Sequence, residues 1–269
     1  MKKFLALIMV VLTLMFMLLG CTQTVKQTGK TESDYTYITE KGEMVIGITL
    51  FAPMNYKEGG ELIGFETEFA TAVCEKLDVT PVFQEINWDS KEIELNAKNI
   101  DCVWNGMTIT QDRMENMEIT DAYMNNRQVM IVKSANLQKY SASVDGAHVV
   151  AEQGSAGEEL ALDDDFFKSS KFTAVDSQAK ALLDVASGTS DVAVVDYVTS
   201  IGSIGADTDF SDLVVVESRQ FSPEEYGIAF RKGSDMVPEI NAAIDELTES
   251  GKLDEIAKKY KLDKLIIKK

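Results

Sequence analysis

The segment 101-DCVWNGMTITQDR-113 is the part of this sequence from which the rest is interpreted. Residues 100–104 are apolar apart from Asp101, which is typical of a strand buried in a core. The segment then changes to small and polar residues, and Arg113 falls at the start of a predicted helix that follows Thr110. The segment therefore predicts a buried strand that ends in a polar turn and is followed at once by a helix that begins near an arginine.

Short apolar strands and helices alternate on the N-terminal side of this segment. Residues 44–50 and 79–86 are predicted strands, and residues 90–98 are a predicted short helix. Residues 66–77 are predicted to be helical because their apolar positions recur at helical spacing, namely Phe69, Ala70, Val73, Cys74 and Leu77. Such alternation favours βαβ units and a mostly parallel sheet.

The same alternation restarts on the C-terminal side. Predicted strands cover 128–133, 148–151, 191–195 and 226–231, and predicted helices cover 176–187, 238–250 and 253–260. The helix start 64-GFE-66 and the later helix start 157-GEE-159 are about ninety positions apart, a longer period than a solenoid repeat has. We therefore expect an α/β fold of two similar lobes with mixed, mostly parallel sheets flanked by helices.

The N-terminus predicts export and a lipid anchor. Lys2 and Lys3 precede an apolar run over 4–19, which is shorter than the roughly 20 residues that span a membrane and fits the apolar region of a secretory signal. The run ends in 18-LLGC-21, which resembles the bacterial lipobox. We expect a lipoprotein signal peptide at 1–20, a lipid on Cys21 and a flexible tether over 21–38. A plain signal peptide or an N-terminal anchor helix is the alternative.

Charge and cysteine content exclude several classes of protein. The net charge is −18, no cluster of lysines or arginines interrupts it, and such a chain is repelled by nucleic acid. Cys74 lies in a predicted helix and Cys102 in a predicted buried strand, so both are predicted to be small core residues. A disulfide between them stays open, because their distance in space is not visible in the sequence.

The order of motifs resembles the bacterial solute-binding protein family 3, the polar amino-acid receptors with the type II periplasmic-binding fold. The motifs are 51-FAPM-54, 64-GFE-66, 101-DCVWNGMTITQDR-113, 154-GS-155, 191-DVAVVD-196 and 226-YGIAFRKG-233. The most specific of them is Gly-Met-Thr-Ile-Thr-x-x-Arg, at 106–113. Together they span nearly the whole mature chain.

The resemblance implies two lobes joined by two crossing segments. Lobe 1 is expected over 39–126 plus 224–269 and lobe 2 over 127–223, with the ligand in the cleft at the carboxyl ends of the strands. It further implies a monomer that is anchored to the cell membrane and faces the outside or the periplasm. Such a protein delivers a free L-amino acid to an ABC permease and its ATPase.

A free amino acid is a zwitterion, so burying it requires a cation for its carboxylate and an anion for its ammonium group. The Arg113 fork suits the carboxylate, and Asp196, at the end of a predicted buried strand, suits the ammonium group. Gly106 and Thr108 are expected to add a backbone donor and a hydroxyl donor. A helix start with free amide groups, which also suits a carboxylate, is expected at Gly154, Ser155 and Ala156.

The resemblance extends the expected site to aromatic and polar neighbours of the ligand. Phe51 and Trp88 match aromatic positions that hold the ligand side chain, and a core aromatic is the alternative for Trp88. Asn105 is expected to contact the ligand through its amide. Glu152 either faces the pocket or is a solvated strand end. The turn 48-ITLF-51 lacks the acidic residue that many members carry, which argues against a cationic ligand and favours a polar or sulfur-containing neutral side chain.

Each of these residues also has an ordinary structural interpretation. Arg113 alone is typical of a solvated helix residue paired with Glu115 or Glu118. Asp196 alone is typical of a helix cap, since residues 197–204 have a helical pattern. The dipeptide 154-GS-155 alone is an ordinary strand-to-helix turn. Only the joint order of the motifs favours the binding site.

Catalytic signatures are missing from the sequence. The single histidine, His148, starts a predicted strand, and no Gly-x-Ser-x-Gly, His-Glu-x-x-His, paired Cys-x-x-Cys or Walker motif is present. We therefore predict no enzyme activity, no metal and no cofactor. A carboxylate-driven lyase or dehydratase on the same fold, with Glu152 as its acid, is one alternative. An amino-acid sensor or adhesin that serves no transporter is another.

Overall fold

The computed structural model describes residues 33–206 and 208–268, so the predicted signal peptide and Cys21 lie outside the described residues. The first helix, α2 (Asp34–Lys41), begins inside the range predicted to be tether. Ser33 caps it, because its hydroxyl oxygen accepts a hydrogen bond from the Thr36 amide at 3.0 Å. The predicted boundary at residue 38 is therefore wrong, and the folded body begins earlier in the chain.

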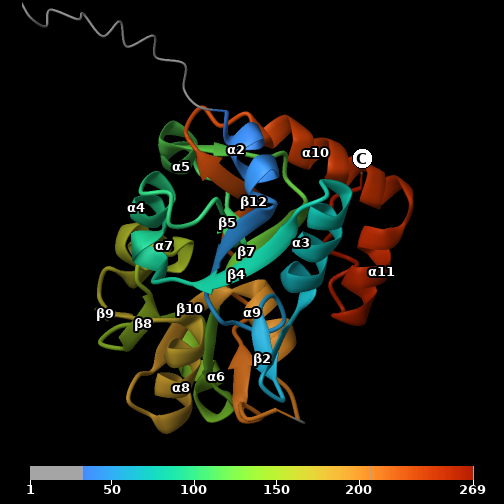
Figure 1. Cartoon of the computed structure of the whole chain (residues 1–269). Helices are drawn as coiled ribbons and strands as arrows, with labels where there is room; N and C mark the ends of the chain where they lie inside the picture. The colour runs from blue at the N-terminus through green and yellow to red at the C-terminus, as the bar shows by residue number, and fades with distance from the viewer. Residues whose placement is uncertain (1–32, 207, 269) are drawn as a thin grey trace, which may run out of the picture. The chain divides into compact units, whose positions relative to one another are not determined.

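One half of the fold, which we call lobe 1, contains parallel strands in the order β4–β1–β5 (Figure 1). These strands are β4 (Thr80–Glu85), β1 (Glu43–Ile48) and β5 (Cys102–Thr108). The helices of this lobe are α3 (Phe65–Lys76), α4 (Lys91–Asn96), α5 (Gln111–Asn116), α10 (Met236–Glu249) and α11 (Lys252–Lys259). Its smaller elements are β2 (Tyr56–Glu58), β3 (Glu61–Ile63), the 3-10 turn η1 (Trp88–Ser90) and β6 (Met117–Ile119).

The other half, lobe 2, contains parallel strands in the order β10–β8–β9. These strands are β10 (Val192–Asp196), β8 (His148–Glu152) and β9 (Lys171–Val175). The helices are α6 (Leu137–Ala142), α7 (Ala156–Asp163), α8 (Gln178–Ser187) and α9 (Tyr197–Ser203). The short elements are η2 (Ser134–Asn136), η3 (Asp165–Phe167) and β11 (Leu213–Val215).

Two long antiparallel strands join the lobes into one mixed sheet. They are β7 (Met124–Lys133) and β12 (Pro223–Arg231), which pair with each other through Pro223–Tyr226 and Met124–Arg127. The remainder of β12 pairs with β5 and β6, whereas the remainder of β7 pairs with β10 and β11. The chain therefore crosses between the lobes twice, as predicted. The sequence predicted β7 to start at Gln128, later than it does.

Each lobe has two apolar cores, one on either face of its sheet. In β5, Trp104 packs in the core under α3, α10 and α11, whereas Val103 and Met107 pack in the core under α4. In β10, Val194 and Val195 divide in the same way between the α7 side and the α8 side. This alternation follows from the two-residue period of a strand, and it explains why both strands read as continuous apolar runs.

The two internal cysteines lie in the same core of lobe 1 and are not bonded. Cys74 on α3 and Cys102 on β5 are buried free thiols, and both belong to the same core. The open question of a disulfide is answered by this arrangement, and the prediction that both are small core residues is confirmed.

A buried arginine ties α2 to the rest of lobe 1. Arg231, at the end of β12, donates from Nε and Nη2 to the Asp34 carboxylate at 3.1 and 2.9 Å. Its Nη1 donates to the carbonyl oxygens of Leu95 and Ile100, and its Nη2 lies 3.6 Å from Asp101 Oδ1. The guanidinium therefore neutralises buried carboxylates and also connects the end of β12 to α4 and to the residue that precedes β5 by two positions, through the carbonyl oxygens of Leu95 and Ile100.

We predict that Arg231→Met lowers the free energy of unfolding by about 3–5 kcal/mol, because it leaves the Asp34 carboxylate buried without its cation. Urea unfolding monitored by circular dichroism measures the change. Lys57→Ala is the control, since Lys57 and its partner Glu85 are both half exposed and such pairs contribute about 0–1 kcal/mol. A loss below about 1 kcal/mol for Arg231→Met would contradict this account of how α2 is held.

Candidate ligand-binding site

The carboxyl ends of β5, β8 and β10 meet at a cavity between the two lobes. About 260 Å³ of the space there is not filled by atoms. The lining residues are Trp88, Asn105, Gly106, Thr108, Arg113, Glu152, Ser155, Ala156, Gln178 and Asp196. All of them except Gln178 are site residues predicted from the sequence. They converge because parallel strands of both lobes point their carboxyl ends toward the same gap.

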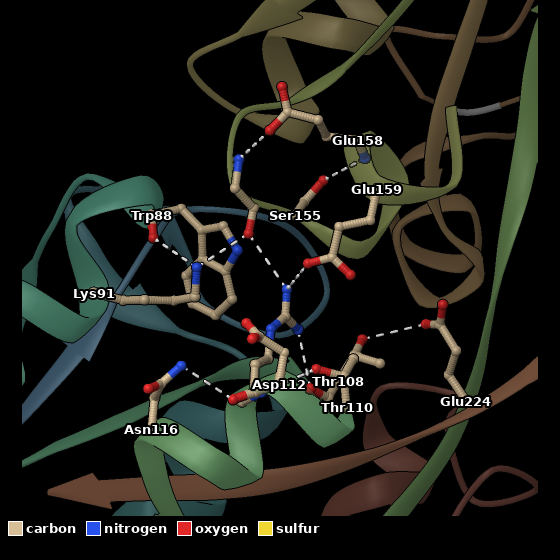
Figure 2. A network of polar contacts seen from close by, with 12 residues as sticks. Trp88, Lys91, Thr108, Thr110, Asp112, Asn116, Ser155, Glu158, Glu159 and Glu224 are labelled. Carbon is tan, nitrogen blue, oxygen red and sulfur yellow. Dashed lines mark hydrogen bonds and ion pairs between the residues drawn. The ribbon is translucent and has the colours of Figure 1, made fainter. Parts of the chain in front are cut away.

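Arg113 belongs to the cavity and not to a solvated helix face. It lies in the first turn of α5, where Thr110 caps the helix by accepting from the Arg113 amide, and it is 3% exposed. Its Nη1 donates to the Thr108 carbonyl oxygen at 2.9 Å, and its Nη2 donates to the Gly154 carbonyl oxygen and to Glu159 Oε1, both at 3.3 Å (Figure 2). The guanidinium of lobe 1 is therefore already bonded to lobe 2, which rules out the pairing with Glu115 or Glu118.

Asp196 occupies a helix N-cap position without acting as a cap. It ends β10 and precedes α9, yet its side chain makes no capping hydrogen bond. Instead Oδ1 accepts from Asn126 Nδ2 and Gln128 Nε2, each at 2.7 Å, and Oδ2 accepts from Gln178 Nε2. Burial raises the pKa of Asp196, and the amide hydrogen bonds counteract that rise. This carboxylate is held in place by donors that point at it and not by the helix that follows.

A second carboxyl lies behind Asp196 and shares its donors. Glu224 on β12 accepts from Asn126 Nδ2 at 3.1 Å, from Gln128 Nε2 at 3.0 Å and from Thr108 Oγ1 at 3.2 Å. Burial, followed by the charge of Asp196, raises the pKa of Glu224 to about 7. The two carboxyls and two amides therefore connect both crossing strands, β7 and β12, to the cavity wall.

Glu152 also lines the cavity, but its carboxyl has less support from hydrogen-bond donors than that of Asp196. It ends β8, is 4% exposed and lines the cavity, so the solvated strand end is excluded. Its Oε1 has no hydrogen-bond partner within the described residues. Burial, followed by the charge of Asp196, raises the pKa of Glu152 to about 8, whereas Lys91 lowers it. The site thus contains one carboxylate with three amide donors and one carboxyl with an oxygen that has no donor in the described part of the chain.

The glycine-serine turn of lobe 2 uses its polar groups to start α7. Ser155 Oγ accepts from the Glu158 amide at 3.1 Å, and the Gly154 amide donates to Glu158 Oε2 at 2.6 Å. Gly154 itself does not line the cavity, but its carbonyl oxygen accepts from Arg113 and from Lys91 Nζ (Figure 2). This segment is therefore a capped strand-to-helix turn that borders the cavity through Ser155 and Ala156.

Two of the predicted donors are already engaged by the protein. The Gly106 amide donates to Glu66 Oε1 at 2.8 Å, and the Thr108 hydroxyl donates to Glu224. Glu66 is fully buried and also accepts from the Tyr123 hydroxyl and from Asn55 Nδ2. The expectation that Gly106 offers its amide to a ligand is therefore wrong in this structure, because Glu66 binds that amide to shape the end of β5.

The remaining predicted residues divide between cavity and scaffold. Trp88 lines the cavity, and Lys91 Nζ lies 4.9 Å from the centre of its ring. Phe51 does not line it, because the Phe51 ring packs in the core of lobe 1 against Gly106. Asn105 lines the cavity, but its Oδ1 accepts from the Thr49 amide at 2.9 Å and its Nδ2 donates to Thr49 Oγ1 at 2.7 Å.

Four functional candidates were missed in the sequence: Asn126, Gln128, Gln178 and Glu224. Asn126 and Gln128 are buried on one face of β7, but their neighbours Asn125 and Arg127 are polar as well, so no apolar–polar alternation marked them in the sequence. Gln178 begins a helix and Glu224 begins a strand, positions where a polar residue is ordinary, so no local signal marked them.

The described residues hold no group of three or more histidine, cysteine, aspartate or glutamate side chains arranged to bind a metal ion. Within the same residues, no helix is both long enough and apolar enough to cross a membrane.

Comparison with known proteins decides the family. The bacterial extracellular solute-binding proteins, family 3, match this chain over residues 44–263. The chain belongs to this family. Its fold of two α/β lobes joined by two crossing strands is the type II periplasmic-binding fold.

Individual members of the family show what the chain is similar to. The L-arginine-binding protein of Pseudomonas aeruginosa is 30% identical over 224 residues, which is 80% of this chain and 86% of that protein. An ABC uptake transporter substrate-binding protein from Streptococcus pneumoniae, solved with bound histidine, superposes with a TM-score of 0.75 at 27% identity, covering 85% of this chain and 96% of that one. The ancestral amino acid-binding protein AncCDT-1, a precursor of cyclohexadienyl dehydratase, gives 0.76 at 27% identity, covering 85% and 99%.

The buried carboxyls predict how stability depends on pH. Burial raises the pKa of Glu66 and of Glu224 to about 7 and that of Glu152 to about 8, against about 4.3 for glutamate in an unfolded chain. Between these values the folded protein holds more protons than the unfolded chain, so we predict that the free energy of unfolding falls as the pH rises from 5.5 to 7.5. Each group contributes at most about 1.4 kcal/mol per pH unit.

Urea unfolding of the ligand-free protein at pH 5.5, 6.5 and 7.5 measures this slope. The variant Glu152→Gln has one titrating carboxyl fewer and should show a shallower slope. The pH range stops at 7.5 because burial lowers the pKa of Lys91 to about 8, and that group acts in the opposite direction above this value. A free energy that is constant or rises with pH would show that these carboxyls are ionised in the folded protein.

Proposed function

We propose that this family 3 protein is an extracytoplasmic receptor that captures one free L-amino acid between its lobes and delivers it to an ABC permease and its ATPase. The observation that carries the proposal is the placement of Arg113 from lobe 1 and Asp196 from lobe 2 on one buried cavity. A cation and an anion at opposite walls match the two charges that all free amino acids share.

The roles of the two residues follow from their hydrogen bonds. Asp196 is fixed by three amides, so it can receive an ammonium group without rearranging. Arg113 uses Nη2 for two lobe 2 acceptors, Gly154 and Glu159, and Nη1 for Thr108. Both N–H groups of Nη2 are engaged by lobe 2, and a carboxylate held in two parallel bonds needs one of them. Such a ligand therefore takes the place of at least one lobe 2 acceptor.

Exchange of these contacts couples binding to the angle between the lobes. A ligand that bonds Arg113 on one side and Asp196 on the other stabilises the closed arrangement, because it makes both contacts only when the lobes are close together. The natural hinge is the short β7–β12 ladder between Arg127 and Pro223, since these strands alone carry the chain from one sheet half to the other among the described residues. We place the lobe boundaries there, at 126/127 and 223/224.

The same proposal includes export and a lipid anchor on Cys21 after removal of residues 1–20. The order of positive residues, apolar run, small residue and cysteine supports it. A short polar segment, 22–32, lies in the sequence between Cys21 and Ser33, the cap of α2. The ligand is then captured at the outer face of the membrane, beside the permease.

Glu152 favours a second function of a different class. A buried carboxyl with an unsatisfied oxygen and a pKa near 8 is protonated at neutral pH, so it has the properties of a general acid for a lyase or dehydratase. The similarity to a precursor of cyclohexadienyl dehydratase supports the fold's capacity for this chemistry. Mass spectrometry of a ligand incubated with the protein distinguishes the two, since a receptor returns it unchanged.

We predict that a panel of free L-amino acids, screened by thermal shift and then calorimetry, contains a ligand whose binding requires both charges. Arg113→Lys keeps the charge but removes the two-pronged donor, and we expect at least a tenfold loss of affinity. Asp196→Ala should cost about 2–5 kcal/mol of binding free energy, as for truncation of one partner of a buried charge pair. The α-carboxamide and N-acetyl analogues of the ligand should bind wild type far more weakly.

The matched control is Glu115→Gln, which changes the charge two positions from Arg113 at an exposed residue outside the cavity. Its affinity should equal that of wild type. Circular dichroism checks that each variant is folded. Equal binding of the amino acid and its amide, or no effect of Arg113→Lys, would show that the carboxylate is not held by Arg113.

The anchor has its own test. We predict that Cys21→Ser abolishes incorporation of labelled palmitate and releases the protein from the membrane fraction, because only the thiol accepts the lipid. Metabolic labelling in a bacterial host, followed by fractionation, measures both. Cys74→Ser changes a thiol that lies buried in lobe 1 and should leave labelling intact. Label on the Cys21→Ser protein equal to that on wild type would refute the lipoprotein assignment.

A further inference from the structure

The charged groups of the cavity do not balance against a neutral amino acid. Of the lining residues, Arg113 is cationic, and Asp196 and Glu152 are acidic. A ligand with one carboxylate and one ammonium group pairs with Arg113 and Asp196 and leaves Glu152 without a partner. The nearby Lys91 acts on Glu152 through its charge but does not bond to Oε1, since its Nζ donates to the carbonyl oxygens of Trp88 and Gly154 and Oε1 has no partner in the described chain.

Glu152 lines the cavity in which we place the ligand. It is the last residue of β8, and the neighbouring strand β10 ends in Asp196, so both carboxyls lie at the same edge of the lobe 2 sheet. Asp196 already accepts from three amides and keeps room for the ligand ammonium group, whereas Glu152 Oε1 is buried and has no partner in the described chain. Buried polar atoms are almost always hydrogen-bonded, so such an atom on a cavity wall marks a place for a donor from outside the chain.

We infer that Glu152 selects ligands whose side chain ends in a positively charged hydrogen-bond donor, so that the receptor takes cationic amino acids. This inference rests on the proposed function, because it assumes that Arg113 and Asp196 hold the α-carboxylate and the α-ammonium group. A guanidinium or ammonium group at the end of the side chain supplies the donor that Oε1 lacks, and its charge balances the carboxylate of Glu152.

The inference reverses the expectation of a neutral ligand. That expectation rested on the missing acid in the turn 48-ITLF-51 of lobe 1. The structure shows an acid on the same cavity from lobe 2. A cation requires a carboxylate at contact distance, whichever lobe supplies it, so the absence of an acid from one turn does not exclude a cationic ligand.

Binding of a cation should release a proton. Where Glu152 is protonated, its O–H bond breaks, the electron pair stays on the carboxylate, the buffer takes the proton, and the ligand cation replaces it. Burial raises the pKa of Glu152 to about 8, so this exchange takes place at neutral pH. Asp196 from β10, Lys91 from α4 and Arg113 from α5 are the charged groups around it, and Glu224 lies behind Asp196.

The test compares charged ligands with neutral ligands of the same shape. L-arginine is measured against L-citrulline, and L-lysine against Nε-acetyl-L-lysine, by calorimetry with wild type and with Glu152→Gln. For wild type we expect at least tenfold tighter binding of the charged member of a pair. For Glu152→Gln, which keeps the size and polarity of the side chain, we expect that preference to fall to less than threefold.

The pH dependence supplies a readout that needs no variant. From pH 6 to pH 8, wild-type affinity for the charged ligand should rise by up to about tenfold per pH unit, because the ionised form of Glu152 becomes available. Titrations at pH 6.5 in buffers of different ionisation enthalpy should show release of nearly one proton. Ionisation of Asp196 and Glu224 affects both members of a pair, so the affinity ratio isolates Glu152.

The outcomes separate this inference from the proposed function. Equal or tighter binding of citrulline, acetyl-lysine or an aliphatic amino acid would overturn the role of Glu152 while leaving the receptor intact. Absence of binding by every free amino acid would overturn the receptor itself. If Glu152→Gln does not fold and binds neither ligand of a pair, two wild-type measurements decide the question. They are the ratio of affinities for the charged and the neutral ligand and the number of protons released on binding.

Discussion

The short antiparallel ladder between β7 and β12 is the constraint on which the rest of the structure depends. It is the place where the two halves of the sheet meet, and it sets β5 of lobe 1 and β10 of lobe 2 on either side of it. Since the parallel strands of each lobe end toward this ladder, the polar residues at their carboxyl ends are collected into one cavity. The position of the site is thus a consequence of topology.

Buried charge explains why so many amides surround the cavity. Asp196 loses its hydration on burial, and a buried carboxylate without hydrogen-bond donors would either become protonated or destabilise the fold. Asn126 and Gln128 on β7 and Gln178 on α8 replace the lost water. Glu152 receives no comparable support, so its unsatisfied oxygen is a cost that a donor from a ligand removes.

Much of the fold and of the candidate site could be predicted from the sequence, for physical reasons that differ between residues. Strands such as β5 and β10 are buried on both faces, so their continuous apolar runs are visible in the sequence. Arg113 was predicted because its motif has a fixed spacing. Phe51 was misplaced, since a turn next to the site and a core position beside Gly106 have the same local sequence.

The sequence by itself determined a two-lobed α/β fold, because burial and turn signals lie in neighbouring residues. The resemblance of its motifs to a family predicted the two crossings and nearly all residues of the cavity wall. Only the tertiary structure decided how the polar groups pair. Glu66 takes the amide of Gly106, and Gln178 takes the carboxylate of Asp196, across many positions of the chain. Hydrogen-bond pairing depends on distances in space, which a linear pattern does not record. The sequence therefore does not show which distant donor bonds to a given acceptor, or that Glu152 Oε1 has no partner in the described chain.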